Sequence, residues 1–432
     1  MNSQQHQFEI LVVGAGPAGM AAACAAAEAG KKVAVLDNAP WLGGQIWRGE
    51  QAQPTSAAAQ RWLQRLRKSG AQVFANATAF AAPAPRRLLA ETPSGVLELT
   101  WQKLILATGA RELFLPFPGW TLPGVLGPGG LHAMSKAGWP VAGKRVVVAG
   151  TGPLLLAVAD RLKQHGAQVS LVVEQTPLAK VMRFGLGLWR HPSKLCQGVG
   201  VKSRLLGVPY RCGCWPVKAE GTGRVQQVTL TDGTRTWTED CDYFACGFHL
   251  VPNVELPLLV GCALSAGAVS VNEFQETTVA DVLCAGEPTG IGGAECALVE
   301  GQIAGLTAAG LTGESRALFS HRAGWHSFRA ALSKAFCLRP ELRQLTTPDT
   351  VVCRCEDVRR DTIEGFANWR AAKLHTRCGM GTCQGRTCGA AAQFLFGWEN
   401  VSVRSPVFPV RVGALISAET TNNNLTTPTL RV

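Results

Sequence analysis

The stretch FEILVVGAGPAG, from Phe8 to Gly19, decides the fold of this chain. Its first six residues form an apolar run that predicts a buried strand, and a glycine-rich turn follows directly. An alanine-rich helix is predicted from there to about Ala29, and a second apolar strand over Lys32–Leu36 ends at Asp37, where a carboxylate can bond ribose hydroxyls. This order of elements predicts a βαβ unit that binds a dinucleotide.

The residues of the turn have separate physical roles. Gly14 permits the tight turn, Gly16 lets the backbone approach a pyrophosphate, and Gly19 lets the helix pack close to the strand. Pro17 and Ala18 stand at the start of the helix. The free N–H groups and the positive dipole end of such a helix attract phosphate.

A second βαβ unit is predicted further along the chain. The run Lys144–Ala149 is typical of a strand, a turn with Gly150 and Gly152 follows, and the next strand ends at Glu174. Leu155 stands where a third glycine would be, so the helix–strand packing is expected to be rearranged. Two interpretations stay open: Gly150, Gly152 and Glu174 bind a second nucleotide, ATP or NAD, or the site is degenerate and kept for packing.

A third glycine-rich turn joins a strand to a helix. Thr278–Ala285 predicts a turn and a strand, Gly286–Gly293 follows, and an amphipathic helix is predicted over Ala294–Ala309. A further helix is predicted over His321–Phe336. The simplest arrangement is an α/β protein with two Rossmann-like, three-layer nucleotide-binding domains, one inserted in the other.

The composition agrees with a folded, core-rich chain. Of 432 residues, 47% are apolar and 17% are charged, which excludes a disordered chain and allows two to four domains. No uncharged apolar run reaches the roughly 18 residues of a transmembrane helix, and the polar start lacks the regions of a signal peptide, so a cytoplasmic location is expected. The net charge of +12 is spread thinly. Nucleic-acid binding is not expected without a recognition module, and a weak attraction to a membrane surface stays open.

Five of the fifteen cysteines lie between Cys353 and Cys388, which in a reducing compartment indicates a metal or redox site. One residue separates Cys353 from Cys355, four separate Cys383 from Cys388, and a helix is predicted after each pair, the first over Asp357–Trp369. Two such loops can bring together the four thiolates that a [2Fe–2S] cluster requires. A structural zinc site also takes four thiolates, but its ligands are more often two residues apart, so iron–sulfur is favoured.

The motifs VVCRCEDV and RCGMGTCQGRTCG, within Val351–Gly389, resemble the bacterioferritin-associated-ferredoxin-like [2Fe–2S] domain. The resemblance implies a small helical C-terminal domain. Cys378 departs from the pattern, since a small residue is expected there, and it is interpreted as a neighbour of the cluster. The implied ligands are Cys353, Cys355, Cys383 and Cys388.

The remainder resembles flavoproteins of the pyridine-nucleotide-disulfide oxidoreductase type. Besides the first turn, the matching motifs are WLGGQIW at Trp41–Trp47, ATGA at Ala107–Ala110, CGFHLVPN at Cys246–Asn253 and CAGE at Cys284–Glu287. Glu287 stands where aspartate is common. The implied FAD site consists of Gly14, Gly16, Pro17, Ala18, Gly19, Asp37, Asn38, Gly44, Gln45, Arg48, Thr108, Gly109, Gly286 and Glu287.

In this order the parts resemble the α (A) subunit of the opine oxidase, D-hydroxyproline dehydrogenase and hydrogen cyanide synthase family. The resemblance implies residues 1–118 and 249–335 as the FAD-binding domain, 119–248 as an inserted NAD(P)-binding-like domain, 345–400 as the [2Fe–2S] domain and 401–432 as a tail.

The family's function would be electron transfer within a hetero-oligomeric, FAD-dependent amino-acid or amine dehydrogenase acting on CH–NH donors of the D-hydroxyproline, proline, opine or glycine class. An oxidase-like, FAD-containing β subunit would oxidise the substrate, so no catalytic residue is expected in this chain. A small ferredoxin-like γ subunit, an interface flavin and peripheral contact with the inner membrane through the electron acceptor are further expectations.

Two other functions fit the same motifs. An NAD(P)H-dependent flavin/[2Fe–2S] reductase would bind NADH at Gly150, Gly152 and Glu174, although Leu155 argues against that site. A non-catalytic redox-sensing scaffold would bind partners without turnover. Thiol–disulfide exchange is not expected, because no cysteine lies near the early Gly43–Gly49 loop.

Overall fold

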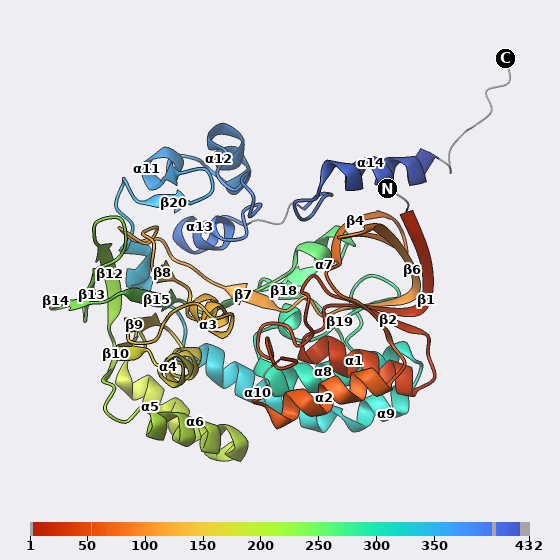
Figure 1. Ribbon diagram of the computed structural model, residues 1–432, viewed down its shortest axis with the longest axis horizontal. Coiled ribbons are helices and arrows are strands. Elements are labelled where there is room, and N and C mark those ends of the chain that lie inside the picture. Colours follow the sequence, from red (N-terminus) through yellow and green to blue (C-terminus); the bar gives the residue numbers. More distant parts are fainter. Residues whose placement is uncertain (1–2, 53, 400–402, 424–432) are drawn as a thin grey trace. The chain divides into compact units, whose positions relative to one another are not determined.

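The computed structural model describes residues 3–52, 54–399 and 403–423, and the chain divides into two compact units (Figure 1). Unit 1 is formed by 1–111, 252–329 and 401–432, and unit 2 by 112–251 and 330–400, in each case as far as the residues are described. Parts of the predicted tail, 401–402 and 424–432, lie outside the described residues. Both units combine sheets with helices, so the predicted α/β class is confirmed.

Unit 1 is built on a seven-stranded sheet whose order is β3-β2-β1-β6-β5-β4, with β19 also paired to β6. The long strand β6 is shared: its first half pairs antiparallel with β5, and its last three residues pair parallel with β19. The predicted first strand is longer than expected, because the polar residues before Phe8 also pair with β6. The strands are β1 (Ser3–Val13), β2 (Val33–Leu36), β3 (Gln72–Phe74), β4 (Thr78–Ala84), β5 (Arg87–Thr92), β6 (Gly95–Leu106) and β19 (Val282–Cys284).

Helices α1, α2 and α8 cover one face of this sheet (Figure 1). Helices α1 and α8 pack closely, because Gly301 and Gly305 lie directly against the carbonyl oxygens of Ala18 and Ala22, where a Cβ atom would clash. The other face has its own core, to which β5, β6 and α7 contribute. The remaining elements are α1 (Pro17–Glu28), α2 (Ala57–Lys68), α7 (Glu255–Leu259), β17 (Leu264–Ser265), β18 (Ala268–Val269), η2 (Glu287–Thr289), α8 (Gly293–Ala308), α9 (Thr312–Ala317) and α14 (Val412–Asn423).

The chain passes between the units in β7 (Ala110–Glu112), β16 (Leu250–Pro252) and α10 (Phe319–Ala335). Strands β7 and β16 pair with each other in a two-stranded ladder. The predicted helices over Ala294–Ala309 and His321–Phe336 are confirmed as α8 and α10, each within one or two residues, but α8 is apolar and largely buried rather than amphipathic.

Unit 2 has a five-stranded parallel sheet of order β11-β10-β9-β15-β8 and a three-stranded antiparallel sheet, β12-β13-β14. The second predicted βαβ unit is confirmed as β9, α4 and β10. The strands are β8 (Val125–Leu126), β9 (Arg145–Gly150), β10 (Gln168–Glu174), β11 (Tyr210–Cys212), β12 (Trp215–Glu220), β13 (Gln227–Thr231), β14 (Thr236–Asp240) and β15 (Tyr243–Gly247). The helices that accompany them are α3 (Pro128–Lys136), α4 (Leu154–Gln164), α5 (Leu178–Gly187), η1 (Leu188–Arg190) and α6 (Pro192–Arg204).

The cysteine-rich segment has a hydrophobic cluster of its own, which includes Val352, Ile363 and Trp369. It contacts the rest of unit 2 through the indole N–H of Trp120, which donates to the carbonyl of Val351 at 2.6 Å, and through Arg354, which donates to the carbonyl of Thr121 at 3.2 Å. Its elements, with the connecting helix before it, are η3 (Pro340–Gln344), β20 (Val351–Cys353), β21 (Val358–Arg359), α11 (Arg360–Ile363), α12 (Trp369–Thr376) and α13 (Cys388–Phe396).

The single helix predicted over Asp357–Trp369 is wrong. Val358 and Arg359 instead form β21, which pairs antiparallel with β20, and a short helix follows. The side chain of Asn368 accepts the N–H of Ala371 and so begins α12 at the point where the predicted helix should have ended.

Among the described residues, no helix is both long enough and apolar enough to cross a lipid bilayer.

Candidate functional site

Three glycine-rich turns of unit 1 lie together at the start of α1: Gly14–Gly19, Gly43–Gly44 and the turn at Gly286. Gly14 has a φ of +105°, and a Cβ atom there would lie 2.2 Å from the carbonyl oxygen of Ala107. A Cβ on Gly19 would lie 1.7 Å from the carbonyl oxygen of Gly14, and one on Gly44 would lie 2.9 Å from Cα of Gly16. Side chains are therefore excluded from the cradle that these turns form.

The N-terminus of α1 is open toward this cradle. Gly16 is the N-cap and supplies no side-chain hydrogen bond, and Pro17 occupies the first turn. The first N–H groups of a helix have no partner within the helix, and the helix dipole adds positive potential there. Ala18 packs against Gly286, where a Cβ would lie 2.7 Å from the Ala18 Cβ, so the third glycine turn also reaches this helix end. The arrangement fits a pyrophosphate.

Asp37 ends β2 and faces the first turn. Its carboxylate accepts the N–H of Ala15 at 2.5 Å and the N–H of Ala39 at 2.7 Å. Burial raises the pKa of this carboxyl group, and the two N–H groups and the charge of Arg48 oppose that rise. Asn38 and Gln45 are exposed, and Arg48 is half-buried.

Thr108 and Gly109 form a turn that is locked to a neighbouring strand end. The hydroxyl of Thr108 donates to the carbonyl of Asn253 at 2.7 Å, and the side-chain amide of Asn253 donates back to the carbonyl of Thr108 at 2.9 Å. Gly109 has a φ of +70° and accepts the N–H of Asn253 at 3.0 Å. Asn253 therefore positions two predicted site residues, although it was not among them.

Glu300 is a second residue that the sequence motifs did not identify. It lies on α8 with 1% of its surface exposed, and its carboxylate accepts the N–H of Gly286 at 2.9 Å and the hydroxyl of Thr289 at 3.0 Å. Burial, with the charge of Glu300, raises the pKa of Glu287 to about 7. The only sequence signal for Glu300 is a charged residue inside an apolar, glycine-rich helix.

His326 and Cys296 surround the same carboxylate. Nε2 of His326 lies 2.8 Å from Oε1 of Glu300, and the Cys296 thiol donates to it at 3.5 Å. The ligand atoms of these three residues lie within 4.8 Å of one another, as they would around a metal ion. However, Arg329 lies 3.6 Å from the same oxygen, and burial raises the pKa of Cys296, which keeps it a thiol. The group is better described as a hydrogen-bonded support for the Gly286 turn.

In unit 2, the glycine turn Gly150–Gly152 is hydrogen-bonded to Glu174, the acid at the end of β10. Glu174 is fully buried, and its carboxylate accepts the N–H of Gly152 at 2.7 Å and the hydroxyl of Thr151 at 2.9 Å. Burial raises the pKa of Glu174. A Cβ on Gly150 would lie 1.7 Å from the carbonyl oxygen of Gly247, so this glycine is needed for strand packing.

Leu155 changes the helix start as the sequence indicated. Helix α4 begins at Leu154, one position later relative to the turn than α1 does, and Leu155 is buried in the core beside it. The residue after Glu174 is also engaged: the Gln175 side chain donates to the carbonyl of Cys337 at 3.1 Å and accepts the N–H of Arg339 at 3.1 Å.

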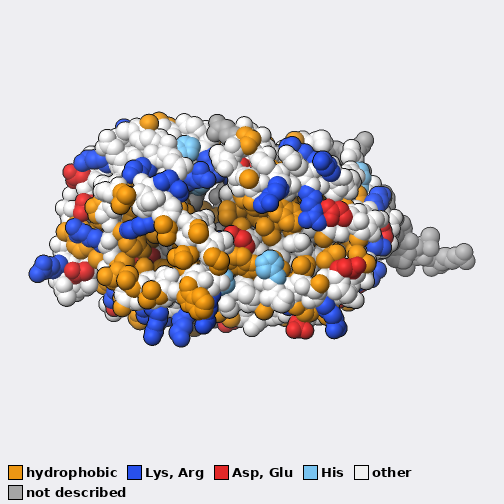
Figure 2. Space-filling view, turned by 90° about the horizontal axis from the view of Figure 1, so that it is seen from below, with side chains coloured by type: hydrophobic (Ala, Val, Ile, Leu, Met, Phe, Trp, Pro, Cys, Tyr) orange, Lys and Arg blue, Asp and Glu red, His pale blue; other side chains and the backbone are white. Residues whose placement is uncertain are grey.

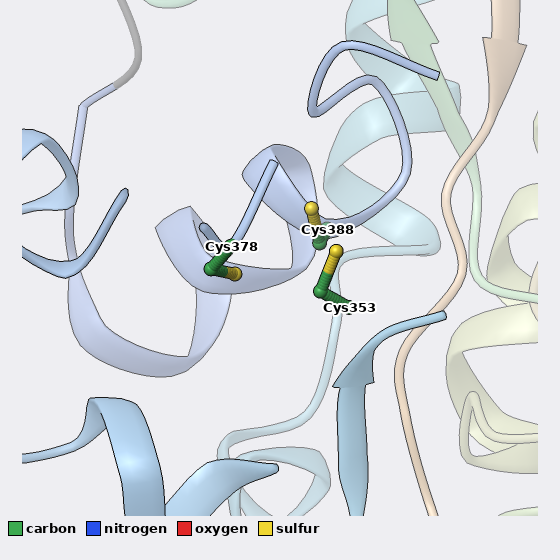
Figure 3. A group of neighbouring side chains, drawn as sticks. All are labelled: Cys353, Cys378 and Cys388. Atoms are coloured by element: carbon green, nitrogen blue, oxygen red, sulfur yellow. The ribbon is translucent and has the colours of Figure 1, made fainter. Parts of the chain in front are cut away.

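The five C-terminal cysteines converge in unit 2. Cys353 ends β20 and Cys388 begins α13, and Figure 3 shows their side chains close together with the sulfur of Cys378 turned toward them. The sulfur atoms of these three residues lie within 4.8 Å of one another. Cys383 interacts with both Cys388 and Cys355, and Cys355 is the most exposed of the predicted ligands.

Hydrogen bonds among these cysteines lower the pKa of two of them and raise the pKa of two others. Donation from Cys378 and Cys388, with the N–H of Gly379 at 3.4 Å, lowers the pKa of Cys353 to about 2. Interaction with Cys388 lowers the pKa of Cys383 to about 4, whereas hydrogen bonds to Cys353 raise the pKa of Cys378 to about 12 and also raise the pKa of Cys388. Thiolates are the form that binds iron or zinc. The donor set therefore fits a metal centre, and Cys378 lies closer to it than a passive neighbour would need to.

A cavity of about 300 Å³ adjoins these thiols within unit 2. Four cysteines line it together with Trp120 and Glu112, whose half-buried side chain accepts the N–H of Gly129 at 2.7 Å and of Gly130 at 3.1 Å. Sequence motifs did not identify Glu112, because it lies on a connecting strand outside every fingerprint.

Comparison with known proteins gives consistent results. The family model of the pyridine nucleotide-disulphide oxidoreductases matches residues 8–301. The HcnB subunit of hydrogen cyanide synthase from Pseudomonas protegens is 31% identical over 419 residues, covering 88% of this chain and 89% of that protein. The A subunit of opine oxidase from Rhizobium meliloti is 29% identical, covering 94% of this chain and 98% of that protein.

Among solved structures, L-proline dehydrogenase from P. horikoshii superposes with a TM-score of 0.69 at 19% identity, covering 96% of this chain and 80% of that one. At this identity the likeness concerns the fold.

Proposed function

Because the chain belongs to the pyridine nucleotide-disulphide oxidoreductase family, we propose that it is the electron-transfer subunit of a hetero-oligomeric amino-acid or amine dehydrogenase. The observation that carries the proposal is that one polypeptide holds both a side-chain-free cradle at a helix N-terminus and a group of five converging cysteines.

Unit 1 would hold FAD. The turn at Gly14–Gly19 and the free N–H groups of α1 would bind the pyrophosphate, and Asp37 would bond the ribose. The turns at Thr108 and Gly286, fixed by Asn253 and Glu300, would close around the remainder. The proposed domain comprises residues 1–118 and 249–335.

Residues 345–400 of unit 2 would form a [2Fe–2S] domain. The proposed ligands are Cys353, Cys355, Cys383 and Cys388, with Cys378 as a thiol that donates to the sulfur of Cys353. FAD accepts electrons in pairs and a [2Fe–2S] cluster accepts them singly, so a chain with both can divide a two-electron oxidation into single transfers. The protein's own part is to orient the cofactors, exclude water and supply N–H donors such as Gly379.

The insert, 119–248, is proposed as a degenerate nucleotide fold. Leu155 takes the place of a third glycine and is buried in the core beside the turn, and Gln175, the residue after the strand-end acid, is held by the carbonyl of Cys337. This supports electron relay over the alternative of an NADH-dependent reductase.

Substrate oxidation is assigned to a partner. The relatives named above are subunits of hydrogen cyanide synthase and opine oxidase. We therefore propose an oxidase-like β subunit with its own FAD, acting on CH–NH donors, with a ferredoxin-like γ subunit or an interface flavin as further members. The complex would act in the cytoplasm, at or near the inner membrane.

The test is anaerobic co-purification of the chain with the products of neighbouring genes. We expect a flavin spectrum and, after reduction by an amino-acid donor such as proline, D-hydroxyproline or an opine, the EPR signal of a reduced [2Fe–2S] cluster. NADH should not bleach the flavin. A chain that stays colourless after reconstitution with FAD, iron and sulfide would overturn the proposal.

A further inference from the structure

The helical hairpin Leu178–Leu206, formed by α5, η1 and α6, exposes a row of large apolar side chains. Leu178, Met182, Leu186 and Trp189 follow one another at helical spacing, so they share one face, and Leu186 and Trp189 are 73% and 68% exposed. None of the residues of α5 is buried. The second helix adds further exposed apolar side chains: Leu195, Val199 and, just after it, Leu206.

The same hairpin is positively charged throughout. No aspartate or glutamate occurs between Gln175 and Ala219. From the neighbouring helix α4, Asp160 faces the hairpin, and its carboxylate binds Arg204 at 2.7 Å. The basic residues of the hairpin are Lys180, Arg183, Arg190, Lys194, Lys202 and Arg204.

Apolar and basic side chains are interleaved on this surface. The guanidinium of Arg190 lies 5.3 Å from the ring centroid of Trp189, so a cation sits directly on the most exposed aromatic ring of the hairpin. Figure 2, which views the molecule from below, shows hydrophobic side chains mixed with Lys and Arg on the left part of the face, where α5 and α6 lie. Within unit 2 the hairpin lies on the opposite side of the five-stranded sheet from the cysteine-rich segment (Figure 1).

We propose that the hairpin Leu178–Leu206 docks on an anionic phospholipid surface. An apolar row that includes tryptophan, flanked by lysine and arginine, is the composition of helices that lie in the membrane interface. Lysine and arginine can extend their charged ends to lipid phosphates while their aliphatic stems stay among the acyl chains. A protein partner would need a large surface of acidic residues around an apolar centre, whereas anionic lipid supplies negative charge without such a match. The lipid surface is therefore the occupant that the charge favours.

The experiment is vesicle co-sedimentation of the full chain, by itself and in complex with its partner. The vesicles are mixed phosphatidylglycerol and phosphatidylcholine, with pure phosphatidylcholine for comparison. We expect binding to the anionic vesicles only, weakened by added salt because exposed charges are screened. Two double variants, Leu186→Ser with Trp189→Ser and Arg183→Glu with Arg190→Glu, should each bind at least about tenfold more weakly.

The matched control is Arg67→Glu with Lys68→Glu, which makes the same change of charge on exposed positions of α2. It should bind vesicles as the unchanged protein does, and circular dichroism should show all variants folded. Absence of binding by the unchanged complex would overturn the proposal, as would equal losses in the control and the hairpin variants. Loss of assembly with the partner in the hairpin variants, without vesicle binding by the unchanged chain, would assign the surface to the partner instead. Flavin and EPR spectra are independent of these outcomes, so failure here leaves the proposed electron transfer intact.

Discussion

The carboxylate of Glu300 accepts the backbone N–H of Gly286 at 2.9 Å, which ties the interior of α8 to the glycine turn that precedes it. The other carboxylate oxygen binds His326, so the group is held from two sides. A buried carboxylate with this many partners fixes a turn more rigidly than a backbone bond alone would.

Replacing Glu300 by glutamine should therefore loosen the Gly286 turn. The glutamine amide keeps one acceptor oxygen, but it can also present N–H groups to His326. The negative charge that the carboxylate offers to the Gly286 N–H and to His326 is lost. We expect FAD affinity to fall by about tenfold, equal to about 1.4 kcal/mol, measured by titrating the apoprotein with FAD and following flavin fluorescence. Glu314→Gln removes an exposed charge on α9 and should have no effect. Equal affinities in the two variants would contradict a positioning role for Glu300.

A second prediction concerns the contact between Gly44 and Gly16. Gly44→Ala places a Cβ 2.9 Å from Cα of Gly16 and also strains a backbone with φ of +59°, so it should weaken FAD binding by more than about tenfold. Gly30 has a φ of +78° with no atom within 4 Å of its Cβ position. Gly30→Ala should therefore lower the free energy of unfolding by about 1–2 kcal/mol through backbone strain alone, and it should leave FAD affinity unchanged. Urea denaturation and FAD titration separate the two effects.

Most of the scaffold could be predicted from sequence because local sequence patterns specify each βαβ unit. A continuous apolar run, a glycine turn and an alanine-rich helix specify their own conformations, and β1, α1 and β2 lie within a few residues of the predicted bounds. The polar start of β1 could not be predicted, since those residues are held by backbone pairing with β6, from Ser3 opposite Val96 onward.

The cysteine-rich segment and the supporting acids were harder to predict for a different reason. The hairpin β20–β21 pairs Cys353 with Val358 across a short, irregular turn, and its strands of three and two residues are too short to show a periodic pattern. Glu300 and Glu112 act through backbone N–H groups of distant turns, and such contacts leave no motif in the sequence. A sequence fingerprint therefore identifies the turn that forms the site. The residues that hold this turn in place are found only from the structure.

A third prediction follows from the raised pKa of Glu287. The folded protein holds a proton on this residue up to pH about 7, whereas the unfolded chain releases it near pH 4.5, so stability should fall as pH rises through that window and level off above it. The fall should be at most about 3 kcal/mol. In Glu287→Gln the fall should be smaller by this amount, as measured by urea denaturation of the apoprotein at several pH values. Parallel pH profiles for the two proteins would show that Glu287 is not protonated in the folded state.

The last prediction separates ligands from neighbours among the cysteines. Cys353→Ser and Cys388→Ser should abolish the [2Fe–2S] EPR signal, because each removes a thiolate from the centre of the group, and Cys355→Ser and Cys383→Ser should do the same from its exposed side. Cys378→Ser should retain the signal with a shifted reduction potential, since its hydroxyl can still donate to the sulfur of Cys353. Iron and sulfide content measured beside EPR distinguishes a lost cluster from an altered one. A Cys378→Ser protein without iron, together with a Cys355→Ser protein that keeps it, would show that Cys378 is the ligand and Cys355 the neighbour.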